Sequence, residues 1–176
     1  MYMKHLKTST HPDISTLEGK TRFTRKSTRA IVLKGEEILL LFTKRYHDYS
    51  LPGGGLDDGE EIISGMVREL KEETGAKGVT NIKEFGIYEE YRPWYKPEFD
   101  VQHMISYCYT CEVHNDLGET QFENHEVHNG MEPVWINIHD AIAHNEHTIL
   151  NSEKKGMSIE RETFLLHLIK KQLLNK

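Results

Sequence analysis

The chain has 176 residues, enough for one domain with a substantial hydrophobic core. Its 28 acidic and 22 basic residues give a formal net charge of −6 at pH 7, with no basic stripe that would neutralise a nucleic-acid backbone. We therefore expect no nucleic-acid polymer as partner. The sequence has no signal segment and no apolar run of about 18 residues, so we expect no membrane partner and a soluble, cytoplasmic protein.

The predicted elements begin after a polar N-terminal arm. Residues 1–25 are expected to form a loose arm or an added edge strand, and residues 26–176 the main domain. Residues 28–34 and 37–43 are rich in Ile, Val and Leu and are separated by a Gly-Glu pair. This pattern predicts a β-hairpin.

A glycine-rich loop and an acidic helix are predicted next, in residues 54–76, GGLDDGEEIISGMVRELKEETGA. At about 100° per residue, Glu72 and Glu73 lie within roughly 60° of Glu69, so three carboxylates share one stripe of the helix. Three like charges this close repel one another, and hard oxygen ligands suit Mg²⁺ or Mn²⁺. The segment therefore predicts a divalent-metal site.

A solvated acidic helix face, paired internally by Arg68 and Lys71, is the alternative interpretation. The flanking residues argue against it. Residues 52–55, PGGG, allow the backbone to approach a ligand closely, and Gly75 is placed to end the helix. The helix is expected to begin at one of three capping residues, Asp57, Asp58 or Gly59.

Further elements follow downstream. Ser158 is expected to cap a last helix, whose apolar residues recur at helical spacing. The other expectations are strands at residues 82–90, 101–113 and 133–138, a polar loop at 115–130 and a short helix at 140–145.

Two pairs of potential metal ligands are interpreted as not binding a metal. Cys108 and Cys111 lie three residues apart on a predicted strand without a second pair, so a reduced core pair is favoured over a zinc or redox site. His125 and His128 lack a matching third ligand and are expected to be solvated.

The segment 54–76 resembles the Nudix box of MutT-like hydrolases, with which it agrees at all seven fixed positions: Gly54, Glu60, Arg68, Glu69, Glu72, Glu73 and Gly75. Ala76 is smaller than the aliphatic residue usual at the last position. The resemblance covers the chain from about Thr28 to the C-terminal helix. It implies an α/β/α sandwich with a mixed β-sheet between helices, and an Mg²⁺-dependent enzyme, with Mn²⁺ as an alternative ion.

The resemblance also implies roles for single residues. Glu72 and Glu73 resemble the core metal ligands, and Glu69 either a third ligand or the residue that activates water. The carbonyl of Gly53 is a further candidate ligand. Arg68 resembles the arginine that orients a catalytic glutamate, with Glu60 as its partner or as an outer ligand. If Glu60 and Arg68 shared one helix they would lie about 12 Å apart, so Glu60 is expected to fold back from the loop.

The resemblance further implies that loop 115–130 supplies another carboxylate, as a ligand or as the general base. Of Glu119, Glu123 and Glu126, we favour Glu126 because it lies nearest the late tryptophan strand. The alternative is that all three are solvated loop acids.

The resemblance implies a pyrophosphohydrolase that cleaves the phosphoanhydride of a nucleoside diphosphate linked to another moiety, such as ADP-ribose, a dinucleoside polyphosphate or a modified nucleoside triphosphate. The alternative is a Nudix domain that senses a nucleotide without cleaving it. Candidate substrate-binding residues are Arg45, Gly54, Tyr88, Tyr91 and Trp94, although each aromatic residue has sheet packing as its alternative. The N-terminal arm and the aromatic segment are candidate contacts of a homodimer.

Overall fold

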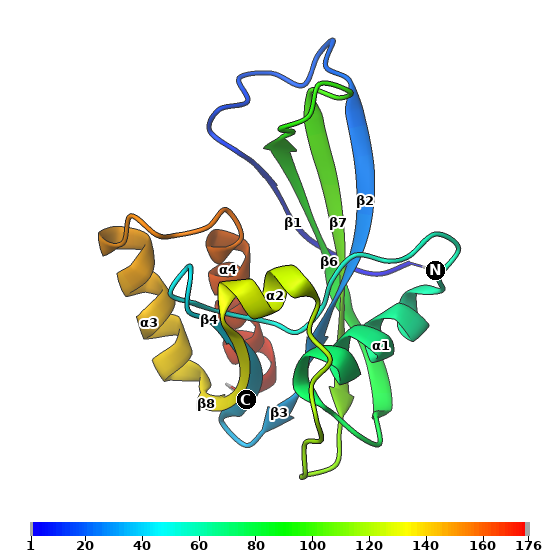
Figure 1. The fold of residues 1–176 in the computed structure, drawn as a ribbon, viewed down its shortest axis with the longest axis vertical. Coiled ribbons are helices and arrows are strands. Elements are labelled where there is room, and N and C mark those ends of the chain that lie inside the picture. The colour runs from blue at the N-terminus through cyan, green and yellow to red at the C-terminus, as the bar shows by residue number, and fades with distance from the viewer. Residues whose placement is uncertain (1, 175–176) are drawn as a thin grey trace.

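The computed structural model describes residues 2–174, and Figure 1 shows their arrangement. Within this range no helix is long and apolar enough to cross a membrane. The strands are β1 (His5–Thr10), β2 (Arg22–Ile31), β3 (Leu33–Lys34), β4 (Glu37–Thr43), β5 (Asp48–Ser50), β6 (Thr80–Pro93), β7 (Val101–Glu112) and β8 (Met131–Asn137). The helices are α1 (Ile62–Thr74), α2 (Asn124–Asn129), α3 (Ile138–Asn151) and α4 (Ile159–Ile169), which ends in a π-helical turn (Lys170–Leu174).

The strands form two sheets, and the chain passes directly from one to the other between β2 and β3. The larger sheet has the order β1-β6-β7-β2 and is mixed, because β1 and β2 run parallel to their neighbours and β6 runs antiparallel to β7. The second sheet joins β3, β4 and β5, with β8 on the other edge of β4. Only Val32 separates β2 from β3, so the chain passes there from one sheet into the other. The far ends of β2, β6 and β7 extend beyond the helices (Figure 1).

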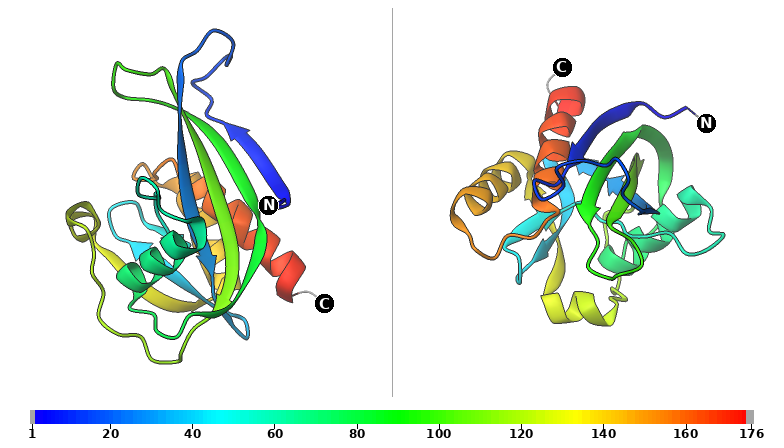
Figure 2. Two further views of the ribbon diagram at one scale, coloured as in Figure 1. Left: turned by 90° about the vertical axis from the view of Figure 1, so that its right-hand side faces the viewer. Right: turned by 90° about the horizontal axis from the view of Figure 1, so that it is seen from above.

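Helices cover both faces of the strands, as Figure 2 shows for α1 on one side and α4 on the other. Successive side chains of a strand point to opposite faces. Accordingly Ile31 packs in the core beneath α3 and α4, while its neighbours Ala30 and Val32 pack in the core beneath α1. The apolar runs of the sequence are thus strands that are buried on both faces. The predicted α/β fold, a mixed sheet between helices, is confirmed.

The predicted hairpin is present but is shorter than expected. Leu33 pairs with Ile38 and Lys34 with Glu37, around the predicted turn. Residues 28–31, however, belong to β2 and pair with β7, because the strand leaves the larger sheet at Val32. The sequence pattern did not reveal this division, since both parts are apolar.

Helix boundaries differ from the prediction at three places. Helix α1 is capped by Glu61, whose carboxylate accepts hydrogen bonds from the backbone N–H of Ile63 and Ser64, so the prediction of Asp57, Asp58 or Gly59 as cap was wrong. The predicted polar loop contains α2, and the predicted short helix at 140–145 extends to fourteen residues in α3. Ser158 occupies the N-cap position of α4 without a capping hydrogen bond, because its Oγ accepts one from Arg92.

The N-terminal arm and the two cysteines both lie in the larger sheet. Strand β1 pairs with β6 as an edge strand, and the Tyr88 hydroxyl donates to Ser9 Oγ at 3.0 Å. Cys108 and Cys111 are free and buried on β7, as predicted, and burial raises the pKa of their thiols to about 12 and about 11. Such thiols are protonated at neutral pH and pack as small apolar side chains.

Candidate functional site

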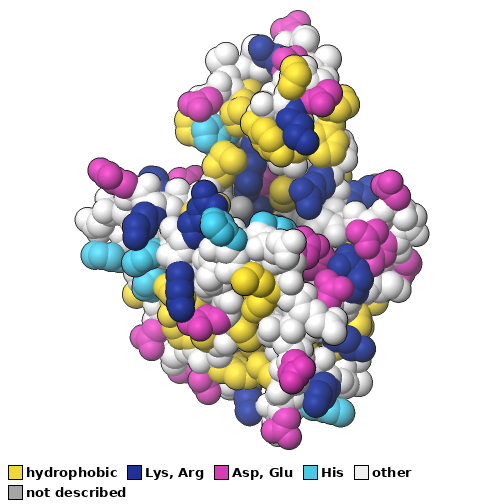
Figure 3. Space-filling model, in the orientation of Figure 1, with side chains coloured by type: hydrophobic (Ala, Val, Ile, Leu, Met, Phe, Trp, Pro, Cys, Tyr) yellow, Lys and Arg dark blue, Asp and Glu magenta, His cyan; other side chains and the backbone are white. Residues whose placement is uncertain are grey.

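A cavity of about 360 Å³ lies where the loop after β5, helices α1 and α2 and the start of α4 meet. Figure 3 shows a hollow on this face of the molecule, below the extended strands, with basic side chains around it. The predicted site residues that line the cavity are Gly53, Gly54, Glu69, Glu73 and Glu126. It is therefore the candidate active site.

The glycine-rich loop is held against β2 by backbone hydrogen bonds. Thr28 N–H donates to the Gly54 carbonyl at 3.0 Å, and Ala30 N–H donates to the Pro52 carbonyl at 2.8 Å. A Cβ atom on Gly53 would lie 1.8 Å from the carbonyl oxygen of Thr28, so only glycine fits there. The Gly53 N–H donates to Glu73 Oε2 at 2.8 Å, which ties the loop to α1.

The acidic stripe of α1 divides between the cavity and the solvent side. Glu69 and Glu73, one helical turn apart, are buried and line the cavity. Glu72 lies outside the lining; its Oε2 accepts a hydrogen bond from Arg68 Nη1 at 3.1 Å, and its side chain remains 31% exposed. The structure therefore brings two of the three predicted carboxylate ligands together.

Arg68 links the loop to the helix. Its Nε and Nη2 donate to the two carboxylate oxygens of Glu60 at 2.7 and 2.9 Å, and its Nη1 donates to Glu69 Oε1 at 3.0 Å. Glu60 lies at the loop end and folds back, and its hydrogen bonds with Arg68 lower its pKa to about 2. Neither Arg68 nor Glu60 lines the cavity, so Arg68 is placed to orient Glu69. Their catalytic roles stay predictions.

Glu126 reaches the same cavity from α2. It is 8% exposed, and its Oε1 accepts a hydrogen bond from the N–H of Glu123 at 2.8 Å as part of a capping box. Burial raises the pKa of Glu73 well above its ordinary value, and the hydrogen-bonded carboxyl of Glu126 raises it further, against the effect of the Gly53 N–H. Burial also raises the pKa of Glu69, against the effect of Arg68.

These acids fit a divalent cation. Glu69, Glu73 and Glu126 bring three buried carboxylates into one cavity lining, and burial raises the pKa of Glu69 and Glu73 because it disfavours their charged forms. Within residues 2–174 no three His, Cys, Asp or Glu side chains are arranged so that they could hold a metal ion by themselves. An incomplete set is what Mg²⁺ uses when substrate phosphates and water complete its coordination.

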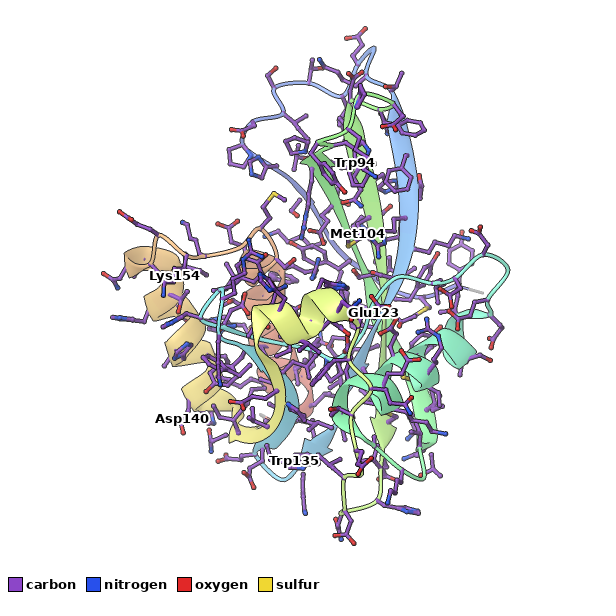
Figure 4. All side chains as sticks on the ribbon, in the orientation of Figure 1. Trp94, Met104, Glu123, Trp135, Asp140 and Lys154 are labelled. Atoms are coloured by element: carbon purple, nitrogen blue, oxygen red, sulfur yellow. The ribbon has the colours of Figure 1, made fainter. Side chains whose placement is uncertain are left out.

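Four predicted substrate-binding residues lie outside the cavity lining. Tyr88 is 2% exposed and packs in the core against Phe164, where its ring has no free face for a ligand. Tyr91 stacks on a histidine of β7, and Trp94 packs on Phe23 in the extended part of the sheet, away from Glu123 of the cavity (Figure 4). Arg45 donates a hydrogen bond to Asn129 at 3.0 Å.

Sequence reasoning missed a basic part of the cavity. Arg25 and Arg29 of β2 and Arg161 of α4 line it, together with Asp48 and Glu162. One signal was available: Arg25 and Arg29 are four residues apart and so share a strand face, in a segment that becomes apolar after Arg29. Nothing in the sequence showed that α4, more than 130 residues later, would meet this strand.

Comparison with known proteins relates this arrangement to one family. The NUDIX domain family matches residues 24–157. A NUDIX hydrolase from Nitrosomonas europaea superposes with a TM-score of 0.58 at 17% sequence identity, covering 85% of this chain and 91% of its own. The MutT protein from Bacillus halodurans superposes with a TM-score of 0.51 at 21% identity, covering 81% and 82%. At these identities the superpositions show a common fold.

Curated relatives are similar over shorter stretches. The RNA pyrophosphohydrolase of Bartonella henselae is 45% identical over 49 residues, which is 28% of either chain. Human diphosphoinositol polyphosphate phosphohydrolase 2 is 32% identical over 108 residues, 61% of this chain and 53% of that one. The chain thus spans 28% to 53% of the length of these relatives. Since the family match covers more than half of the chain and includes the loop, α1 and α2 that build the cavity, the chain belongs to the Nudix family.

Proposed function

We propose that this protein is a metal-dependent pyrophosphohydrolase that cleaves the phosphoanhydride of a nucleoside diphosphate derivative. One observation carries the proposal: Glu69 and Glu73 of α1 meet Glu126 of α2 in a single cavity, although more than 50 residues separate them in the chain. Buried acids with raised pKa values that meet in a cavity are candidates for a functional site.

Each acid has a distinct position. Glu69 and Glu73 would hold Mg²⁺ or Mn²⁺, with the Gly53 carbonyl and Glu72 as further candidate ligands. When bound, the cation would neutralise phosphate charge and lower the pKa of bound water. Glu126 would accept a proton from the attacking water, and the hydrogen bond from the Glu123 N–H to its Oε1, which fixes the carboxylate, supports this role.

The substrate class is supported less directly. The named relatives act on RNA in one case and on a diphosphoinositol polyphosphate in the other, which supports a phosphorylated substrate. Tyr46 lines the cavity and offers a ring to stack on a base. Tyr91 and Trp94, outside the lining, stay predictions that would require a long substrate.

The test is a substrate panel with Mg²⁺, with Mn²⁺ and with EDTA. It contains ADP-ribose, dinucleoside polyphosphates, NADH, sugar nucleotides, oxidised nucleoside triphosphates, 5′-triphosphorylated RNA and a diphosphoinositol polyphosphate. We expect metal-dependent release of phosphorylated products from at least one nucleoside diphosphate derivative. Glu73→Gln should lower turnover by about 100-fold or more, because the amide carries no charge for the cation. The exposed Glu119→Gln is the matched control, and wild-type turnover in Glu73→Gln would refute the proposal.

The same panel separates the enzyme from a nucleotide sensor. Equilibrium dialysis measures nucleotide affinity, and phosphate-sensitive detection measures product. Nucleotide binding without product from any substrate, with either metal, would favour the sensor.

A further inference from the structure

A buried arginine at the cavity has no well-placed counter-ion. Arg29 is 8% exposed and lines the cavity, on the same strand face as Arg25. Its Nε makes no hydrogen bond to any described residue, and its ion-pair contact with Glu162 Oε1 is 3.9 Å long. A buried guanidinium group normally requires pairing and hydrogen bonds to offset its lost hydration. The described part of the chain leaves this requirement of Arg29 largely unmet.

The neighbouring carboxylates are held by other arginines. Oε1 of Glu162 accepts a hydrogen bond from Arg161 Nη2 at 3.0 Å. Oε2 of Glu90 accepts one from Arg161 Nη1 at 2.6 Å, and Oε1 of Glu90 accepts one from Arg92 Nε at 2.7 Å. Among the described residues, three guanidinium groups therefore share two glutamates, and Arg29 is the one that has no short ion-pair contact.

Arg161, which also lines the cavity, is a second arginine in residues 2–174 with an unsatisfied hydrogen-bond donor. Its Nε also lacks a hydrogen-bond partner in the described part of the chain. Burial, and then the charge of Arg161, lower the pKa of Arg29, which shows that the two cations are close enough to repel. Asp48 compensates Arg161 only in part, because burial raises the pKa of Asp48 to about 7. An entering anion would relieve this repulsion.

We propose that Arg29 and Arg161 form a subsite for a second anionic group of the substrate, the phosphoryl group that does not lie against the metal-binding carboxylates. This inference rests on the proposed function, in which the first phosphoryl group lies at Glu69 and Glu73. The same cavity is lined by Glu73 and by Arg29, so a diphosphate has an acidic, metal-bearing end and a basic end available to it. The planar guanidinium fork matches two phosphate oxygens at once.

Two variants of the same kind test the subsite, Arg29→Met and Arg92→Met. Arg92 belongs to the same buried network and holds Glu90, yet it lies outside the cavity lining, so it is the matched control. Isothermal titration calorimetry would measure the affinity for methylenediphosphonate, a non-hydrolysable diphosphate, in the presence of Mg²⁺. Thermal melting of the free proteins and Mn²⁺ affinity would be measured alongside.

We expect Arg29→Met to weaken methylenediphosphonate binding about tenfold or more, because charge-assisted hydrogen bonds to the anion are lost. Its Mn²⁺ affinity should stay unchanged, and its melting temperature should equal or exceed that of the wild type, because an uncompensated buried charge is removed. Arg92→Met should melt lower, because Glu90 loses a partner, but should bind methylenediphosphonate as the wild type does.

Three results would overturn the subsite: a wild type that does not bind methylenediphosphonate, an Arg29→Met variant that binds it as the wild type does, or an Arg29→Met variant that melts as low as Arg92→Met. The experiments test the proposed subsite and the proposed hydrolase activity independently. Arg29-dependent binding without cleavage of any panel substrate would retain the subsite and refute the hydrolase, and cleavage with unchanged binding in Arg29→Met would do the reverse.

Discussion

Arg68 offsets the repulsion between the carboxylates beside the cavity. Its guanidinium group donates to Glu60, Glu69 and Glu72 within 3.1 Å, so it compensates acids on both the loop and the helix. Glu73, without such a partner, depends on the Gly53 N–H. The hydrogen bonds from Arg68 therefore fix the orientation of the Glu60, Glu69 and Glu72 carboxylates. Glu73 has no hydrogen bond from Arg68, so its carboxylate is more available to a cation.

Arg68→Lys should lower kcat by about 10- to 100-fold with a smaller change in KM, because an ammonium group cannot reproduce the forked contacts that orient Glu69. Steady-state kinetics on the substrate found in the panel would measure this. Arg92→Lys, a change of the same type at a guanidinium group outside the cavity lining, is the control. Equal losses in both variants would contradict the positioning role.

Glu126→Gln should lower kcat by about 10²- to 10⁴-fold, the usual contribution of a general base, and leave the melting temperature close to that of the wild type. The capping hydrogen bond from the Glu123 N–H can still be accepted by the amide oxygen. The exposed Glu119→Gln should have wild-type kinetics. A Glu126→Gln variant with full turnover would move the base to another residue.

At the scale of the elements, α1 is defined by how its ends are held. Its first turn is capped by the Glu61 side chain, and its last by Gly75, which has a φ of 72° and whose N–H donates to the Lys71 carbonyl. Gly118 N–H in turn donates to the Gly75 carbonyl at 2.6 Å, which attaches the loop that leads to α2. The end of α1 thus helps to position the loop that carries Glu126.

Gly75→Ala should therefore lower the free energy of unfolding by more than the strain of a positive φ at residue 75 would by itself. Gly59 has a nearly identical φ of 75°, and a Cβ there would have no other atom within 4 Å, whereas a Cβ on Gly75 would lie 2.1 Å from the Gly118 carbonyl oxygen. We expect Gly59→Ala to lower the free energy of unfolding by about 1 kcal/mol and Gly75→Ala by at least about 2 kcal/mol. Urea denaturation would measure both, and equal losses would contradict the close approach.

At the scale of the whole molecule, the buried charge network joins elements that are distant in the chain. Arg161 of α4 donates hydrogen bonds to Glu90 of β6 and to the adjacent Glu162, and Glu162 lies 3.9 Å from Arg29 of β2. The Leu51 N–H, just before the glycine-rich loop, donates to Glu162 Oε2 at 3.1 Å. The last helix therefore helps to fix the loop at which the candidate chemistry occurs.

Asp48 makes this network sensitive to pH. Burial, and then the charge of Glu162, raise its pKa to about 7 against the effect of Arg161. Because the folded-state pKa lies above the unfolded value of 3.8, this group contributes stability that is complete below about pH 4 and is lost as the pH rises through about 7.

Asp48→Asn should consequently raise the melting temperature relative to the wild type at pH 8, and the difference should shrink as the pH falls toward 5. The neutral amide resembles the protonated acid, so the variant does not undergo the loss of stability that ionisation of Asp48 causes as the pH rises toward 7. Differential scanning calorimetry of both proteins between pH 5 and 8 measures the difference, in which the titration of other groups largely cancels. A difference that does not depend on pH would contradict the raised pKa.

The sequence by itself determined the parts of this protein that depend on local spacing. The box fixed α1 with Glu69 and Glu73 on one face, and apolar runs marked the central strands, because helical and strand periods are local properties. Tertiary structure decided the rest. Only long-range packing brings Glu126 to Glu73 and α4 to Arg29, and buries Tyr88 in the core. Such contacts depend on how separate elements pack, which no short stretch of sequence encodes.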